Sequence, residues 1–275
     1  MDEDPKDTID VLESVWASID ELCSGLSAHE WDLPTDCPGW TVKDQVSHII
    51  GTESMLAGKP TPDQEVVPRP YVKNRIGEMN EVHVEARRRL PPEEVLAEFR
   101  SITQERLEDL RNMSLEEFGR QVMTPEGPGS YLDFMKIRVF DCWVHEQDIR
   151  RAVKKPGNLA GKAARNAVSR CFKAMPYVVE KKAAFPEGAS VTFVISYRDT
   201  PPPDKLTVTV KSGRGIAVDS FEALPSVKFR SDVGTYVALC SGRINPRTSL
   251  KEGIVELAGD ETLGYRLIDN LAFVI

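Results

Sequence analysis

An aspartate and a histidine four residues apart, Asp141 and His145, lie within a long segment of helical periodicity. Residues at this spacing are neighbours on one face of a helix, so a carboxylate oxygen and an imidazole nitrogen can point to the same place. These two donors suit zinc or another divalent first-row metal. Surface ion pairs and satisfied buried networks use the same spacing, so the pair alone leaves a purely structural role open.

The rest of this segment indicates that the pair is buried. Four polar side chains fall within its apolar side when successive residues are placed about 100° apart: Arg138, Asp141, His145 and Asp148. Burying an unpaired carboxylate is costly, so a metal, a substrate or a network of ion pairs must compensate them. We predict that Asp148 and Arg138 support the ligands from outside the coordination sphere. In this role Asp148 orients a ligand or pairs with Arg138 or Arg151, and the alternative is an ordinary helix salt bridge.

A catalytic zinc site needs three protein ligands and one open position. His48 is the candidate for the third ligand, in a helix expected over residues 42–56. Thr41 and Asp44 form a capping-box pattern at the start of this helix. His48 lies at the margin of the apolar stripe of the helix, so periodicity alone does not select it.

The other histidines and the cysteines do not suggest a second site. The five cysteines are widely scattered and include no CxxC pair, which is typical of reduced thiols. Cys142 follows Asp141 but points about 100° away from it on the helix. We therefore predict that Cys142 is a core residue. His29 and His83 lack neighbouring ligand types, and we predict that both lie on the surface.

The elements that must position these side chains are helical in the first half of the chain and mixed in the second. Helices are expected over residues 8–26, 42–56, 74–90, 93–113, 131–153 and 159–179, with a proline-rich loop at 58–70. Strands are expected over residues 190–197, 206–211, 216–218, 227–230 and 254–257, with helices at 232–240 and 260–271. A basic Lys-Lys-Pro-Gly stop signal ends at Gly157. The sequence thus predicts an α+β protein of two domains, residues 1–156 and residues 157–275.

The composition excludes several classes of protein. Of 275 residues, 41% are hydrophobic and 28% are charged, as in globular proteins. The net charge of -8 argues against nucleic acid as a partner, because phosphate binding needs a basic face. No apolar run approaches the roughly 20 residues that span a bilayer, and the acidic start lacks the pattern of a signal peptide. We expect a cytoplasmic protein without a membrane partner.

Two sequence patterns resemble those of the mycothiol-dependent maleylpyruvate isomerase family of actinobacteria: Cys37-Pro-Gly-Trp-Thr-Val-Lys-Asp44 followed by His48, and Asp141-Cys-Trp-Val-His-Glu-Gln-Asp148. In that family a Pro-Gly-Trp turn precedes a helix that carries a histidine, and a later helix carries E-x3-H or D-x3-H followed by H-x2-D. The resemblance implies an N-terminal DinB-like four-helix bundle. It also implies a smaller sterol-carrier-protein-like α+β domain, with Gly-Asp260 before its final helix, and so extends over nearly the whole chain.

The resemblance also implies a ligand set and a reaction. Two histidines and a glutamate hold zinc in the characterised isomerase, which corresponds here to His48, His145 and the shorter Asp141. The metal would bind the thiol of mycothiol, a thiol cosubstrate, and the thiolate would attack an electrophilic carbon. The outcome is either cis–trans isomerisation or S-transfer. The partners would then be a small-molecule thiol and an electrophilic substrate, and the protein a monomer or homodimer.

Two other functions remain open at this stage. The protein could be a metal-dependent hydrolase that activates water at the same site. It could also be a non-catalytic metal-binding protein whose second domain binds a small apolar ligand or a partner. The sequence identifies neither the electrophile nor any catalytic or thiol-binding side chain beyond the three ligands.

Overall fold

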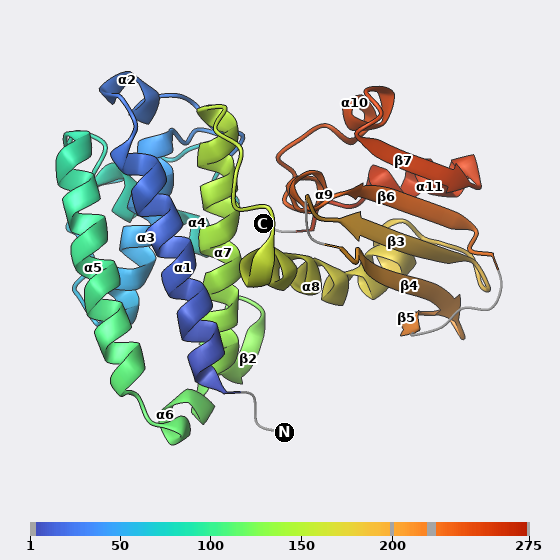
Figure 1. Ribbon diagram of the computed structural model, residues 1–275, viewed down its shortest axis with the longest axis horizontal. Coiled ribbons are helices and arrows are strands. Elements are labelled where there is room, and N and C mark those ends of the chain that lie inside the picture. The colour runs from blue at the N-terminus through green and yellow to red at the C-terminus, as the bar shows by residue number, and fades with distance from the viewer. Residues whose placement is uncertain (1–3, 199–200, 219–223, 274–275) are drawn as a thin grey trace. The chain divides into compact units, whose positions relative to one another are not determined.

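The computed structural model describes residues 4–198, 201–218 and 224–273. The chain forms two compact units, Met1–Gly157 and Asn158–Ile275. The first unit is helical, and the second contains a sheet and several helices (Figure 1). The chain is therefore an α+β protein with its helical part first, as predicted.

Four long helices build the first unit: α1 (Pro5–Ser24), α3 (Val42–Leu56), α5 (Pro92–Asn112) and α7 (Tyr131–Ala152). Helix α1 packs on α5 and α7, and α3 packs on the same two helices (Figure 1). Leu12, Ile49, Phe99 and Trp143, one from each helix, are completely or almost completely buried between them. The four helices thus enclose one core, and α7 is buried over most of its length.

Capping boxes fix where two of these helices begin. At α3, the Thr41 hydroxyl accepts from the Asp44 amide and the Asp44 carboxylate accepts from the Thr41 amide, as predicted. Ser130 and Asp133 do the same for α7. Each cap of this kind contributes about 1 kcal/mol. The two caps therefore fix the starts of the helices that carry the candidate ligands.

Shorter elements depart from the sequence prediction. Helix α4 (Arg75–Glu85) packs on α3 and ends well before residue 90. Here the Arg87 amide donates a hydrogen bond to the Val84 carbonyl, and the Arg87 guanidinium donates one to the His83 carbonyl. Four other short elements were not predicted: α2 (Ala28–Trp31), α6 (Leu115–Gly119), β1 (Gln121–Thr124) and β2 (Gly127–Ser130).

The second unit is a five-stranded sheet with helices. Its strands, in the order β5-β4-β3-β6-β7, are β5 (Arg214–Val218), β4 (Asp204–Lys211), β3 (Ser190–Ser196), β6 (Val227–Asp232) and β7 (Val255–Gly259). Among the strand pairs that the described residues form in this sheet, only β3–β6 is parallel. The helices are α8 (Gly161–Tyr177) with the π-turn η1 (Val178–Lys182), α9 (Val233–Cys240), α10 (Pro246–Lys251) and α11 (Glu261–Ile268). All five predicted strands are present, and α10 was not predicted.

The core of the second unit is aromatic. Phe193 and Phe229, on neighbouring strands, contact each other and Tyr236 of α9, with ring centroids 5.6–6.0 Å apart. Phe172 of α8 completes this cluster. The second unit therefore has a hydrophobic core of its own.

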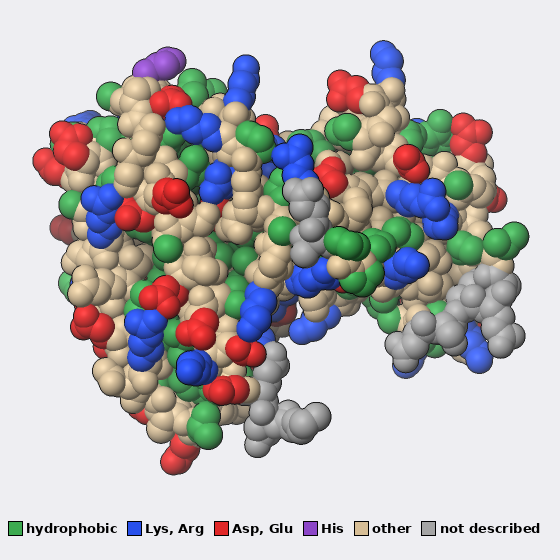
Figure 2. Space-filling model, viewed as in Figure 1, with side chains coloured by type: hydrophobic (Ala, Val, Ile, Leu, Met, Phe, Trp, Pro, Cys, Tyr) green, Lys and Arg blue, Asp and Glu red, His purple; other side chains and the backbone are tan. Residues whose placement is uncertain are grey.

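Charged side chains of both signs are interspersed on the face of the first unit shown in Figure 2. Two of the ion pairs join α5 to α1, Arg100 with Asp20 and Arg111 with Glu13. Exposed pairs of this kind contribute less than about 1 kcal/mol each.

Among the described residues, no helix combines the length and the apolar character that a membrane span requires.

Candidate metal centre

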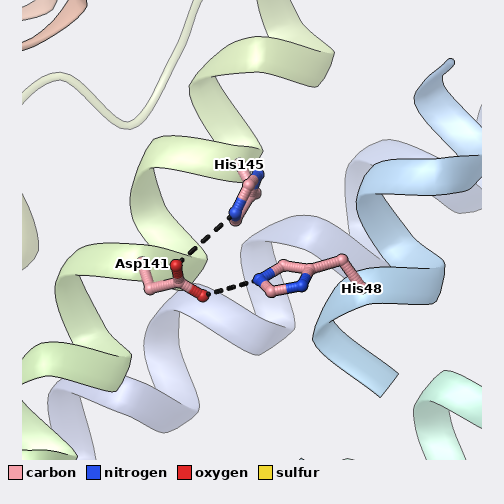
Figure 3. A group of neighbouring side chains, drawn as sticks. All are labelled: His48, Asp141 and His145. Atoms are coloured by element: carbon pink, nitrogen blue, oxygen red, sulfur yellow. Dashed lines mark hydrogen bonds and ion pairs between the residues drawn. The ribbon is translucent and has the colours of Figure 1, made fainter. Parts of the chain in front are cut away.

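Three side chains from two helices converge in the first unit: His48 of α3, and Asp141 and His145 of α7 (Figure 3). His48 Nε2 lies 3.2 Å from Asp141 Oδ2, and His145 Nε2 lies 3.5 Å from Asp141 Oδ1. One potential ligand atom from each residue lies within 4.8 Å of the other two. The structure thus brings the three predicted residues together, and their role as ligands stays a prediction.

The donor set and its spacing fit a divalent metal. Ligand atoms 2.0–2.2 Å from one tetrahedral zinc are about 3.4 Å from one another. His48 Nε2 lies 3.2 Å from one Asp141 oxygen and His145 Nε2 lies 3.5 Å from the other. One ligand atom from each residue lies within 4.8 Å of the others, so the three side chains are close enough to share one ion. Two imidazole nitrogens and one carboxylate oxygen form a three-ligand set of the kind that catalytic zinc uses.

Burial and charge set the protonation states of the cluster. Both histidines are buried, whereas the Asp141 side chain is 29% exposed. Burial lowers the pKa of His48 to about 4, although Asp141 acts in the opposite direction. Burial also acts to raise the pKa of Asp141, but Arg138 and the two histidines outweigh it and hold that pKa well below its usual range. At neutral pH, His48 is therefore neutral and Asp141 is ionised, the forms that bind metals.

A chain of buried ion pairs supports Asp141. Arg138 donates to the Asp141 carboxylate and, over 2.8 Å, to Glu53. The second Glu53 oxygen accepts from Arg106 over 3.2 Å, and Arg106 also donates to the Tyr131 hydroxyl. Glu53, Arg106 and Arg138 are almost inaccessible to solvent. Arg138 thus contacts a candidate ligand, and Glu53 compensates two guanidinium groups at once.

His145 is held by a residue that the sequence analysis missed. Its Nδ1 lies 2.5 Å from Gln45 Oε1, and the fully buried Gln45 stands on α3. Asp148 Oδ2 is 3.7 Å from the same nitrogen, too far for a hydrogen bond. The other Asp148 oxygen accepts from Arg151. Gln45 is therefore the hydrogen-bond partner of His145, and Asp148 pairs with Arg151.

Comparison with known proteins identifies the family of this chain. The family model described as mycothiol maleylpyruvate isomerase N-terminal domain matches residues 12–150, which include all three candidate ligands. The chain belongs to this family. The family predicted from the sequence is therefore confirmed. None of the curated proteins matches the chain.

Two solved structures match most of the chain. The crystal structure of the mycothiol-dependent maleylpyruvate isomerase is 15% identical, with a TM-score of 0.56 over 88% of this chain and 91% of that one. A single-residue mutant of that enzyme gives 14% identity and a TM-score of 0.55, with the same coverage. At this level of identity, the likeness shows that the fold is shared over both units.

The Pro-Gly-Trp turn places the indole ring of Trp40 beside the two histidines of the candidate site. Gly39 has a φ of 78°, and a Cβ at this position would lie 2.1 Å from the Tyr71 ring. Both the backbone conformation and the close approach therefore require glycine. The next residue, Trp40, lies 5.2 Å from the His48 ring and 5.8 Å from the His145 ring, measured between centroids.

His83 does not lie on the surface, so that prediction was wrong. It is 7% exposed because α3 and α4 approach closely at Gly51, where a Cβ would lie 2.4 Å from His83 Cγ. His29 is exposed, as predicted. Cys142 is fully buried, as predicted, and burial raises its pKa to about 12. Its sulfur contacts Trp16 and Arg138.

Proposed function

We propose that this protein is a metal-dependent enzyme that uses mycothiol, a low-molecular-weight thiol, as a nucleophile. Its reaction would be that of a thiol S-transferase or of a maleylpyruvate-type cis–trans isomerase. The observation that carries this proposal is the convergence of His48, Asp141 and His145 in a chain of this family. The thiol is proposed because the matched isomerase structure is described as mycothiol-dependent.

In this proposal, His48, Asp141 and His145 bind zinc or another divalent first-row metal. Such a cation lowers the pKa of a bound thiol, so that the sulfur is anionic at neutral pH. Two neutral imidazoles and one carboxylate carry a single negative charge, too little to neutralise a divalent cation. The ligand set therefore favours an anionic sulfur at the remaining position.

The surrounding residues would limit access to the cluster from one side. Trp40 lies against both imidazole rings and is 8% exposed, whereas Asp141 is the most exposed of the three candidate ligands. A small molecule would therefore approach from the side of the carboxylate. Arg138 would hold that carboxylate in place, since it donates to it from the buried side.

The two candidate reactions share their first bond. The sulfur lone pair forms a carbon–sulfur bond, and the π electrons of the attacked double bond move onto the electron-withdrawing group conjugated with it. In an isomerase, rotation and elimination restore the double bond and release the thiol. In a transferase, the carbanion takes up a proton from solvent and the carbon–sulfur bond remains in the product. The protein supplies the position and the charge of the nucleophile in both cases.

Cobalt substitution tests this function. When mycothiol is added to the cobalt-loaded protein, we expect a sulfur-to-metal charge-transfer band in the absorption spectrum. The oxygen analogue of the thiol should give no band, and His48→Ala should abolish both the band and any thiol-dependent turnover. If the cobalt-loaded protein shows no spectral change with the thiol but hydrolyses an ester or amide, the protein is a hydrolase. A protein that does neither would be a binding protein.

We also propose that the two parts of the chain have different roles. Residues 1–156 would form the DinB-like metal-binding bundle, and residues 157–275 a sterol-carrier-protein-like domain. The two compact units support these bounds, because all three candidate ligands lie in the first unit and the five-stranded sheet lies in the second.

A further inference from the structure

Gln45 connects the candidate metal site to the Pro-Gly-Trp turn. Its side-chain amide lies between His145, 2.5 Å from Oε1, and the hydroxyl of Thr35, 2.7 Å from Nε2. Gln45 is completely buried, so neither end of the amide can exchange its partner for bulk water. The way the amide points therefore follows from the groups that surround it.

The hydroxyl of Thr35 fixes this orientation. A hydroxyl donates one hydrogen bond and accepts up to two. Thr35 Oγ1 lies 2.9 Å from the Trp40 carbonyl, which can only accept, so its one proton is used there. It accepts from the Cys37 amide over 3.3 Å. The remaining lone pair must face a donor, and the donor end of Gln45 is its NH2 group.

This leaves the carbonyl oxygen of Gln45 facing His145. A carbonyl oxygen only accepts, so His145 Nδ1 must carry a proton. In a neutral imidazole the other nitrogen, Nε2, then keeps its lone pair. Nε2 faces Asp141 Oδ1 at 3.5 Å, longer than an ordinary N–H···O hydrogen bond, so the shorter contact with Gln45 decides which nitrogen keeps the proton. Asp148 does not compete, because it is 3.7 Å away and binds Arg151.

We infer that Gln45 and Thr35 are positioning residues, which fix Nε2 as the nitrogen that His145 offers to a metal. This inference rests on the proposed metal site for its purpose, but the hydrogen-bond chain exists without a metal. The chain ends on two backbone groups of the turn, the Cys37 amide and the Trp40 carbonyl. The turn thus determines which nitrogen of His145 points into the site.

The experiment is a ring-nitrogen NMR measurement on metal-free protein labelled with 15N-histidine, at a pH where the imidazoles are neutral. His145→Ala identifies the His145 signals. We expect a protonated Nδ1 and an unprotonated Nε2 in the wild type. Gln45→Met removes the acceptor, and Thr35→Val removes the hydroxyl that orients it, so both should give a mixture of tautomers. Thr35→Ser keeps the hydroxyl and should retain the wild-type spectrum.

Metal affinity provides the second measurement. Competition with a chelator should show that Gln45→Met weakens zinc binding by about tenfold, the usual effect of losing such a supporting contact. Circular dichroism checks that each variant is folded, and Thr35→Val serves if Gln45→Met is not. A protonated Nε2 in the wild type, or an unchanged His145 spectrum in folded Gln45→Met or Thr35→Val, would overturn the inference. Because the NMR measurement uses neither metal nor thiol, its result is independent of the proposed function.

Discussion

Asp141 has two sets of partners that compete for one carboxylate. Arg138 donates to Oδ2, the oxygen that also faces His48, and Oδ1 faces His145. The guanidinium keeps the carboxylate ionised and oriented, but it also withdraws charge from a potential ligand atom. The short Asp141 side chain is therefore supported from its buried side, and its negative charge is what a divalent metal would need.

The charge of Asp141 is tested by two substitutions. Asp141→Asn keeps the size but removes the charge, so we expect zinc affinity to fall by at least tenfold, since it alters the ligand itself. Asp141→Glu keeps a carboxylate, the group that the family resemblance implies at this position, and should retain zinc. Both affinities can be measured by competition with a chromophoric chelator. Equal affinities for Asp141→Asn and wild type would show that Asp141 is not a ligand.

His145 is the second test at this scale. The purified protein should contain close to one zinc, nickel, iron or cobalt ion per chain, and His145→Ala should lose it because one of three ligands is gone. His29→Ala is the matched control, because His29 is exposed on α2, outside the cluster. Elemental analysis measures the metal content of the wild type, His145→Ala and His29→Ala. The site is refuted if His145→Ala keeps the metal content of the wild type.

At the scale of the helices, charged residues in apolar stripes connect the bundle. Glu53 lies on the buried face of α3, and Arg106 occupies the same kind of position on α5. Each is a charged residue on the otherwise apolar face of its helix, and the two form an ion pair with each other. Arg138 of α7 joins them through Glu53. Three helices are thus held together by a network that ends at Asp141.

Removing the charge of Glu53 should destabilise the bundle. Glu53→Gln leaves two buried guanidinium groups without their shared carboxylate, which costs about 3–5 kcal/mol for comparable buried pairs. Glu105→Gln breaks an exposed pair with Lys59 and should cost less than about 1 kcal/mol. Urea denaturation of the metal-free proteins measures both. Similar losses for the two variants would mean that the buried network contributes little.

The turn before α3 can be tested with two glycines. Gly39→Ala places a side chain at positive φ and against the Tyr71 ring, whereas Gly58→Ala meets only the positive φ, with nothing within 4 Å of the new Cβ. The backbone strain costs about 1–2 kcal/mol. We expect Gly58→Ala to lose about that much free energy of unfolding, and Gly39→Ala clearly more. Equal losses would show that Tyr71 moves aside without penalty.

Local signals explain which elements the sequence predicts. The Thr41–Asp44 capping box and the i, i+4 pair on α7 depend on neighbours in sequence, and both are present. Strand β2 is Gly-Pro-Gly-Ser, a composition that strands usually avoid, and only its pairing with β1 makes it a strand. Such pairing leaves no periodic signal within the segment itself.

Contacts between helices explain what the sequence misses in the site. Periodicity does not select His48, because its closeness to Asp141 depends on how α3 packs on α7. His48 was instead chosen as a histidine on an early helix of the bundle, and the family resemblance then agreed with that choice. Gln45 and Glu53 were missed for the same reason: their partners His145 and Arg138 lie 100 and 85 residues further along the chain. A buried polar residue can be flagged from a helical wheel, but its partner cannot.

For the whole molecule, the two units should separate in limited proteolysis. Residues 154–160 form no helix or strand, residues 154–156 are exposed, and Lys154 and Asn158 have positive φ. Residues 59–69 also lack regular structure. A protease of broad specificity should therefore cut first in these two segments, where the backbone can enter its active site. Initial cleavage between residues 206 and 218, within β4 and β5, would contradict this organisation.

When the chain is cut only within residues 154–160, the metal should remain with the N-terminal fragment. All three candidate ligands, together with Gln45 and the network of Glu53, belong to the first unit. The second unit supplies none of the three residues, so its removal leaves the donor set complete. Size-exclusion chromatography of the cleaved protein under mild denaturant, followed by elemental analysis, should find zinc only with the helical fragment. A folded, zinc-free N-terminal fragment would mean that the bundle alone does not hold the metal.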